Sequence, residues 1–116
     1  MGLIHPTREE LRLADVLHAL SDQQRLSIVR CLAEDTTPRR CGSFGLDISK
    51  STLTHHFRVL REAGVIDQRE AGTARLNSLR REDLDARFPG LLGAVLAAAP
   101  APVSASASER IRADAR

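Results

Sequence analysis

One segment of this 116-residue chain carries every signal of a well-defined helix, and it constrains the fold more than any other feature. Ser49 suits an N-cap, because its short side chain can accept a hydrogen bond from an N–H of the first turn. The apolar residues after it are spaced by four and three and therefore share one face: Leu53, Phe57 and Leu60. Ala63-Gly64 is a helix stop. The sequence predicts an amphipathic helix from Ser49 to Gly64.

Two extended runs follow this helix directly. Residues 65–70 and 74–79 flank Ala71-Gly72-Thr73, a pattern typical of a β-hairpin with a glycine-containing turn. Alternate residues of a strand share a side, which places Asp67 with Arg69 on one strand and Arg75 with Asn77 on the other. A helix followed at once by a hairpin, or wing, indicates a winged helix-turn-helix.

The chain before this unit predicts two helices and a third, short one. Thr7-Arg8-Glu9-Glu10 has the form of a capping box and opens a helix whose apolar stripe is Leu13, Leu17 and Leu20. Ser21-Asp22-Gln23-Gln24 repeats the signal and opens a second helix, in which Leu26, Val29, Leu32 and Ala33 share a face. Between Glu34 and Asp47 a turn and two glycines leave room for only a short helix.

After the hairpin, residues 81–87 are polar and predict a single turn. Pro89 suits the first position of a last, almost wholly apolar helix through Leu91, Leu92, Val95 and Leu96. Residues 100–116 are Ala, Ser and Pro with scattered charge, and we expect them to be disordered. The prediction is one mainly α domain over residues 1–99, a winged helix-turn-helix of about five helices and a two-stranded hairpin, with a tail over 100–116.

Composition narrows the class of partner. Aromatic residues make up 3% of the chain, with no Trp and no Tyr, which argues against single-stranded nucleic acids, because their bases stack on aromatic rings. Between Ser49 and Arg81 there are seven basic and three acidic residues, so positive charge is concentrated around the helix and the wing. Double-stranded DNA is the better candidate.

The face of the Ser49–Gly64 helix opposite the apolar stripe suits the major groove. Its short polar side chains near the N-terminus can reach base edges, and they are Ser51, Thr52, Thr54 and His55. Lys50 and Arg58 flank them and would hold phosphates, while the amides at Ser49 and Lys50 add a phosphate site at the helix start. On the wing, Arg69 and Arg75 would reach the minor groove or its phosphates. His56 lies toward the apolar face, where a hydrogen-bonded packing role is expected.

Two stretches resemble a known family. Residues 19–29, ALSDQQRLSIV, look like the "ALSDPTRLRIL" opening of ArsR/SmtB-type repressors, and residues 51–66, STLTHHFRVLREAGVI, are similar to their "STVSRHLKVLREAGLV". The resemblance covers about Ala14 to Leu79. It implies a homodimer formed by the first and last helices, two recognition helices in successive major grooves of a near-palindromic operator, and repression that an effector releases.

Departures from the family pattern argue against metal sensing. The CxC pair before the helix-turn-helix is absent, since Cys41 has no second cysteine within two residues, and the last helix has no His, Asp or Glu between Phe88 and Ala99. We therefore expect no metal and no cofactor, and an unidentified non-metal effector, for instance a small molecule. The apolar last helix would suit a small-molecule pocket as well as a dimer interface.

Other functions stay open at this point. Cys31 and Cys41 suggest a thiol-based redox-sensing repressor, although Cys31 beside Leu32 suits a buried thiol. A winged-helix protein–protein interaction module would need apolar residues on the outer side of the helix, where Lys50, Thr54, His55 and Arg58 stand instead. No nucleophile, base and orienting group pair up, so we expect no enzyme. Neither a signal peptide nor a membrane span is evident, and we expect a cytoplasmic protein without membrane contacts.

Overall fold

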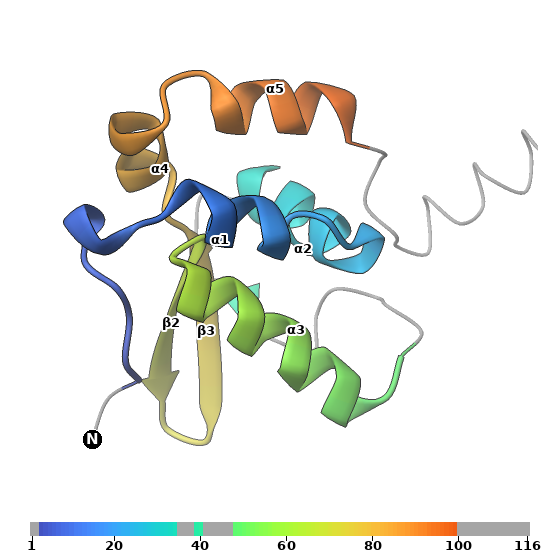
Figure 1. Cartoon of the computed structure of the whole chain (residues 1–116). Helices are drawn as coiled ribbons and strands as arrows, with labels where there is room; N and C mark the ends of the chain where they lie inside the picture. The colour runs from blue at the N-terminus through green and yellow to red at the C-terminus, as the bar shows by residue number, and fades with distance from the viewer. Residues whose placement is uncertain (1–2, 35–38, 41–47, 100–116) are drawn as a thin grey trace, which may run out of the picture.

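Five helices and a small antiparallel sheet make up the part of the chain that the structure, a computed structural model, describes: residues 3–34, 39–40 and 48–99 (Figure 1). In chain order these elements are α1 (Leu13–Ala19), α2 (Gln23–Glu34), β1 (Arg39–Arg40), α3 (Lys50–Ala63), β2 (Ile66–Ala71), β3 (Ala74–Leu79), α4 (Arg81–Arg87) and α5 (Leu91–Ala98). The predicted mainly helical winged helix-turn-helix is confirmed. The short helix expected before Asp47 and the tail over 100–116 lie outside the described residues.

The chain before α1 differs from the prediction of one helix starting at Thr7. The Thr7 N–H donates to Oε1 of Glu10 at 2.8 Å, as a capping box requires, but the turn it opens is a 3-10 turn that ends at Glu10. Leu11 is then extended, with φ −65° and ψ 131°, and α1 begins only at Leu13. This break turns the Leu11 side chain into the core, where it is 1% exposed.

The apolar stripe predicted for the first helix divides between two sides of α1. Val16, Ala19 and Leu20 are buried, whereas Leu13 and Leu17 are 47% and 46% exposed. An apolar face of α1 therefore points away from the core of the single chain.

The start of α2 also differs in its capping residue. The sequence predicts a cap at Ser21, but Oδ1 of Asp22 accepts the N–H groups of Gln24 at 2.8 Å and Arg25 at 3.1 Å. The Ser21 hydroxyl instead donates to the carbonyl of His18 at 2.6 Å, at the end of α1. Ser21 thus binds the end of α1 and Asp22 caps the start of α2, so the connection between the two helices is short.

The hairpin forms as predicted. Strands β2 and β3 pair from Ile66 opposite Leu79 to Ala71 opposite Ala74, and Gly72 in the turn has φ 65°. The two-residue strand β1 adds to the other edge of β3, so the sheet order is β1-β3-β2. Strand β1 was not predicted, because two residues are too few to show an alternating pattern.

Two short helices complete the described chain. The prediction of a single turn over residues 81–87 is wrong, because these residues form the seven-residue helix α4. The prediction that Pro89 is the first residue of the last helix is wrong: α5 begins at Leu91, and its N-cap is Gly90 with φ 82°. This left-handed residue turns the chain between α4 and α5, a conformation that favours glycine over residues with a side chain. Leu92 is buried, and a guanidinium N–H of Arg30 on α2 donates to the carbonyl of Leu96, which ties α5 to the domain.

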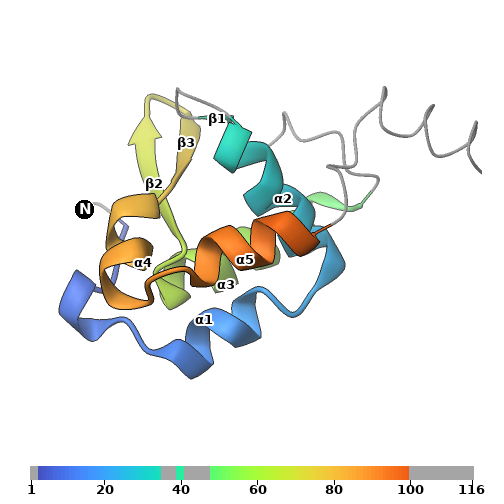
Figure 2. The same cartoon turned by 90° about the horizontal axis from the view of Figure 1, so that it is seen from above.

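Helix α3 and the pair α1 and α5 lie on different sides of the domain. In Figure 1, α1 and α5 lie above α3, while the N-terminal end of α3 and the hairpin turn both lie at the bottom of the view. Seen from above, α5 crosses over α3 beside α1 (Figure 2). The core between these layers includes the buried side chains of Ile28, Val29, Phe57, Leu60 and Val65. No helix in the described ranges has the length and apolarity to cross a membrane.

Candidate nucleic-acid interface

Helix α3 has the ends that the sequence predicts. Oγ of Ser49 accepts the Thr52 N–H at 3.2 Å and the Ser49 hydroxyl donates to Oγ1 of Thr52 at 2.9 Å, so this side chain is committed to capping. At the other end Gly64 has φ 86°, and its N–H bonds back to carbonyls of the last turn. Of the first-turn amides, the cap takes that of Thr52, and the residues of this turn are exposed.

The two faces of α3 divide as expected. His56, Phe57, Leu60 and Ala63 are buried, and Leu53 and Val59 are partly buried. All seven predicted contact residues from the helix and its cap are exposed: Ser49, Lys50, Ser51, Thr52, Thr54, His55 and Arg58. We call this set the reading face. It presents hydroxyls, one imidazole and two cations to solvent without a large apolar side chain.

His56 is a buried, hydrogen-bonded residue, in agreement with the interpretation from the sequence. It is 7% exposed, and its Nδ1 accepts a hydrogen bond at 3.0 Å from Nη1 of Arg25 on α2. A guanidinium has donors only, so Nδ1 carries no proton and the neutral ring is protonated on Nε2. Burial lowers the pKa of His56 below its ordinary value; nearby Asp22 acts against this, while Arg25 and His55 add to it.

The two wing arginines lie on opposite faces of the hairpin. In the register Arg69 is opposite Leu76, and Arg75 is opposite Glu70. Because side chains alternate along each strand, Arg75 shares a face with Gln68, whose side chain contacts α3, while Arg69 shares the other face with Asp67. Nε of Arg69 lies 3.7 Å from Oδ2 of Asp67. Both arginines are exposed, but they point to different sides of the wing.

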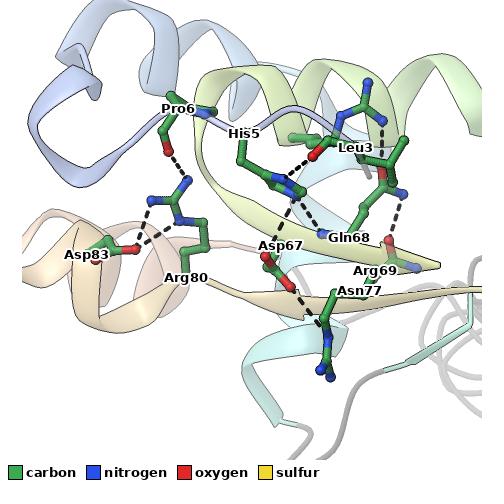
Figure 3. Close-up of polar contacts among 10 residues, drawn as sticks. Leu3, His5, Pro6, Asp67, Gln68, Arg69, Asn77, Arg80 and Asp83 are labelled. Atoms are coloured by element: carbon green, nitrogen blue, oxygen red, sulfur yellow. Dashed lines mark hydrogen bonds and ion pairs between the residues drawn. The ribbon is translucent and has the colours of Figure 1, made fainter. Parts of the chain in front are cut away.

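The root of the wing is held by a polar cluster (Figure 3). The side-chain amide of Gln68 donates to Asn77 on β3, and Arg61 at the end of α3 donates to Oε1 of Gln68 at 2.8 Å. The outer edge of β2 is covered by the N-terminal segment, where Nε2 of His5 accepts the Gln68 N–H at 2.9 Å. These contacts fix the wing to α3 and to residues 3–6.

A second cluster ties the same N-terminal segment to α4. Arg80 donates to the carbonyl of Pro6 at 2.7 Å and to Oδ2 of Asp83 at 2.9 Å, while Arg8 donates to Oδ1 of Asp83 at 2.7 Å. The hydrogen bond from Arg8 lowers the pKa of Asp83; partial burial acts against it, and Arg80 lowers it further.

The structure bears on one of the two cysteines and on the possibility of a metal site. Cys31 is 6% exposed on α2, and Cys41 lies outside the described residues. Within the ranges that the structure describes, no three His, Cys, Asp or Glu side chains gather in a way that could hold a metal ion.

Comparison with known proteins places the helix-turn-helix in a family. Residues 22–68 match the model of the family described as bacterial regulatory protein, arsR family. An uncharacterized HTH-type transcriptional regulator of Bacillus subtilis, YceK, is 37% identical over 81 residues, which span 68% of this chain and 81% of that protein. This chain belongs to the ArsR family. A second relative, an uncharacterized HTH-type transcriptional regulator of Methanocaldococcus jannaschii, is 32% identical over 63 residues, 53% of this chain and 71% of that protein.

The range that matches the ArsR family model contains α2, β1, α3 and the first half of β2. The family resemblance predicted from the two sequence stretches is therefore confirmed. Helix α1 lies before the match, and β3, α4 and α5 lie after it.

The sequence pattern did not single out Arg25 as a residue of interest. It stands four residues before Val29 and seven before Leu32, on the buried face of α2, and is itself 7% exposed. The sequence does contain a signal for Arg25, which is a cation at an apolar position of a helix. Arginine is rarely buried without partners, so such a position indicates a bound guanidinium.

Proposed function

We propose that this ArsR-family regulator is a homodimeric repressor that binds a near-palindromic operator in double-stranded DNA through the reading face of α3. The supporting observation is that this face is exposed over its whole length while the wing turn lies at the same end of the domain (Figure 1). Ser51, Thr52, Thr54 and His55 would contact base edges, and Lys50 and Arg58 would contact phosphates. Arg69 and Arg75 are the proposed wing contacts.

The proposed dimer forms through α1 and α5. Leu13 and Leu17 expose nearly half of their surface on α1, and the apolar α5 lies beside that helix (Figure 2). Covering the exposed half of each leucine is favourable, because full burial of an exposed Leu side chain contributes about 1.5–3 kcal/mol and these side chains would gain part of that. A two-fold axis at these helices would place two α3 helices in successive major grooves, with half-sites about 34–36 Å apart.

The proposal includes an unidentified non-metal effector, a cytoplasmic location and no catalytic activity. The redox alternative gains no support from Cys31, whose thiol is buried rather than accessible to oxidants. The protein–protein alternative requires an apolar outer side of α3, and the reading face is polar.

The test starts from duplexes that the unaltered protein selects from a random-sequence pool. Lys50→Ala and Arg58→Ala should each weaken binding to all duplexes and reduce the slope of log K against log salt by about one unit for each phosphate that the protein no longer binds. Thr54→Ala and His55→Ala should instead relax the sequence preference. Arg81→Ala on α4 removes the same charge away from the reading face and serves as the matched control. Failure to select any preferred sequence, or equal effects of Arg81→Ala and Arg58→Ala, would refute the proposal.

A further inference from the structure

Arg25 joins three helices through one buried guanidinium. Its Nε donates to the carbonyl of Ala19 at 2.7 Å and its Nη2 to that of His18 at 3.4 Å, both at the C-terminal end of α1. Its Nη1 donates to His56 on α3, and its own backbone N–H is held by Asp22. The carbonyls of the last turn of a helix lack partners within that helix, so Arg25 satisfies α1 while it holds α3.

His56 completes this link from the α3 side. It directly follows His55 of the reading face, and their ring centroids are 5.9 Å apart. Its Nε2 lies 4.0 Å from Oδ1 of Asp22, the carboxylate that caps α2. A displacement of His56 would therefore move a residue of the reading face relative to the ends of α1 and α2.

Stability alone does not account for a buried arginine at this joint. Taking a charge out of water is costly, and apolar residues of similar size often stabilise a core equally well. A guanidinium is planar and donates in fixed directions, so it holds partners at a defined angle where apolar packing would tolerate several. The arrangement is suited to setting the orientation of α3 against α1.

We propose that Arg25 and His56 are positioning residues that fix the orientation of α3 relative to α1, and thereby set which spacing of operator half-sites the dimer accepts. This inference rests on the proposed function, in which α1 forms part of the dimer interface. Rotation of α3 against α1 would change the separation of the two reading faces in a dimer. In this proposal both residues act through the orientation of α3 and not by contacting DNA.

The link depends on a neutral His56. Its ring accepts from Arg25 through Nδ1, and a proton on that nitrogen would end the hydrogen bond and place two cations together. The charged and titratable groups that act on His56 are Arg25 on α2, Asp22 before α2 and its neighbour His55; α1 contributes the two carbonyls bound by Arg25. His56 also lines a cleft of about 540 Å³, together with Asp22 and Thr52 among others.

The experiment uses the full chain and a series of duplexes. The best duplex selected by the unaltered protein is rebuilt with its half-sites moved apart or together one base pair at a time, and Kd is measured for each spacing. His56→Leu keeps a side chain of similar volume but removes the acceptor. His56→Asn keeps an acceptor, Oδ1, near the position of Nδ1 and cannot be protonated. Thermal unfolding of each variant confirms that it is folded.

We expect the unaltered protein and His56→Asn to prefer one spacing by about tenfold or more, and His56→Leu and Arg25→Met to lose that preference. Because burial lowers the pKa of His56, its ring takes up a proton only below the usual titration range of histidine. Lowering the pH from about 8 to below that range should abolish the preference of the unaltered protein but not that of His56→Asn. The same spacing preference in His56→Leu, or the same pH response in His56→Asn, would overturn the inference. If the unaltered protein selects no duplex, the proposed function has failed instead. Should His56→Leu not fold, the pH comparison between the unaltered protein and His56→Asn decides.

Discussion

The side-chain amide of Gln68 donates to Oδ1 of Asn77 at 2.7 Å, and the two residues are 2% and 0% exposed. They stand opposite one another in the hairpin, at the root of the wing. Arg61 and His5 bind Gln68 from α3 and from the N-terminal segment, so polar contacts add to the apolar packing that joins these three parts. Hydrogen bonds in a buried polar network have fixed directions and so favour one arrangement of these parts over its alternatives.

Asn77→Leu should therefore destabilise the protein, because it removes the acceptor of the 2.7 Å hydrogen bond from the Gln68 amide in a buried site. We expect a loss of about 1–3 kcal/mol in the free energy of unfolding, measured by urea denaturation. The double variant Gln68→Leu, Asn77→Leu removes both amides and should cost less than the sum of the two single changes. Costs that simply add would show that the two amides act independently.

Gly64→Ala tests the contact between the end of α3 and the N-terminal segment. Gly64 has φ 86°, and a Cβ added there would overlap Cδ2 of Leu11. The left-handed backbone costs about 1–2 kcal/mol and the clash about 1–3 kcal/mol more, so the loss of stability should exceed that from the backbone alone.

Gly72→Ala in the wing turn is the matched control for Gly64→Ala. Gly72 also has a positive φ, 65°, but a Cβ there meets nothing within 4 Å. Only the backbone cost of about 1–2 kcal/mol applies. Equal losses for the two variants in thermal or urea unfolding would argue against the packing of Leu11 on Gly64.

The parts of the fold that sequence predicts well are those with dense local signals. Helix α3 has a capping serine, an apolar stripe and a terminal glycine within sixteen residues, and the wing has two alternating runs around Gly72. Such signals depend on neighbours in the chain, and the exposed residues of the reading face follow from the same helical spacing.

The parts that sequence does not predict depend on contacts between distant residues. The break before α1 occurs because Leu11 packs against Gly64, fifty-three positions away in the numbering, and no local pattern encodes that. Likewise strand alternation places Arg75 and Asn77 on one face, but the burial of Asn77 follows only from its pairing with Gln68. Arg25 gains its role from His56, thirty-one residues away.

Asp83→Asn should make the stability of the protein less dependent on acid pH. The pKa of Asp83 is lowered in the folded protein, by the hydrogen bond from Arg8 first and also by Arg80, with partial burial acting the other way. A carboxyl whose folded pKa is lowered contributes stability above its unfolded pKa of about 3.9 and loses that contribution as the pH falls through the folded value. The difference in unfolding free energy between the unaltered protein and Asp83→Asn should be constant near neutral pH and shrink below about pH 4.

The Asp83 comparison separates this carboxylate from Asp22, whose pKa is also lowered. At Asp22 partial burial acts in the opposite direction, and the N–H groups of Arg25 and Gln24 outweigh it. Asp22 is present in both proteins, so its contribution cancels in the difference. A difference that stays constant down to about pH 2 would show that Asp83 gains nothing from its arginine partners.

The two wing arginines should contribute unequally to DNA binding. Arg75 lies on the face of the hairpin that is turned toward α3, and therefore toward the groove that the reading face would occupy. Arg69 lies on the other face, with Asp67 3.7 Å from its Nε. Arg75→Ala should reduce the salt slope of binding to the selected duplex by about one unit, as expected when one phosphate is no longer bound, and Arg69→Ala by less.

Asp67→Ala is the matched control, because it frees Arg69 from its partner and should strengthen binding only if Arg69 approaches DNA. A larger loss from Arg69→Ala than from Arg75→Ala would place the DNA on the opposite face of the wing.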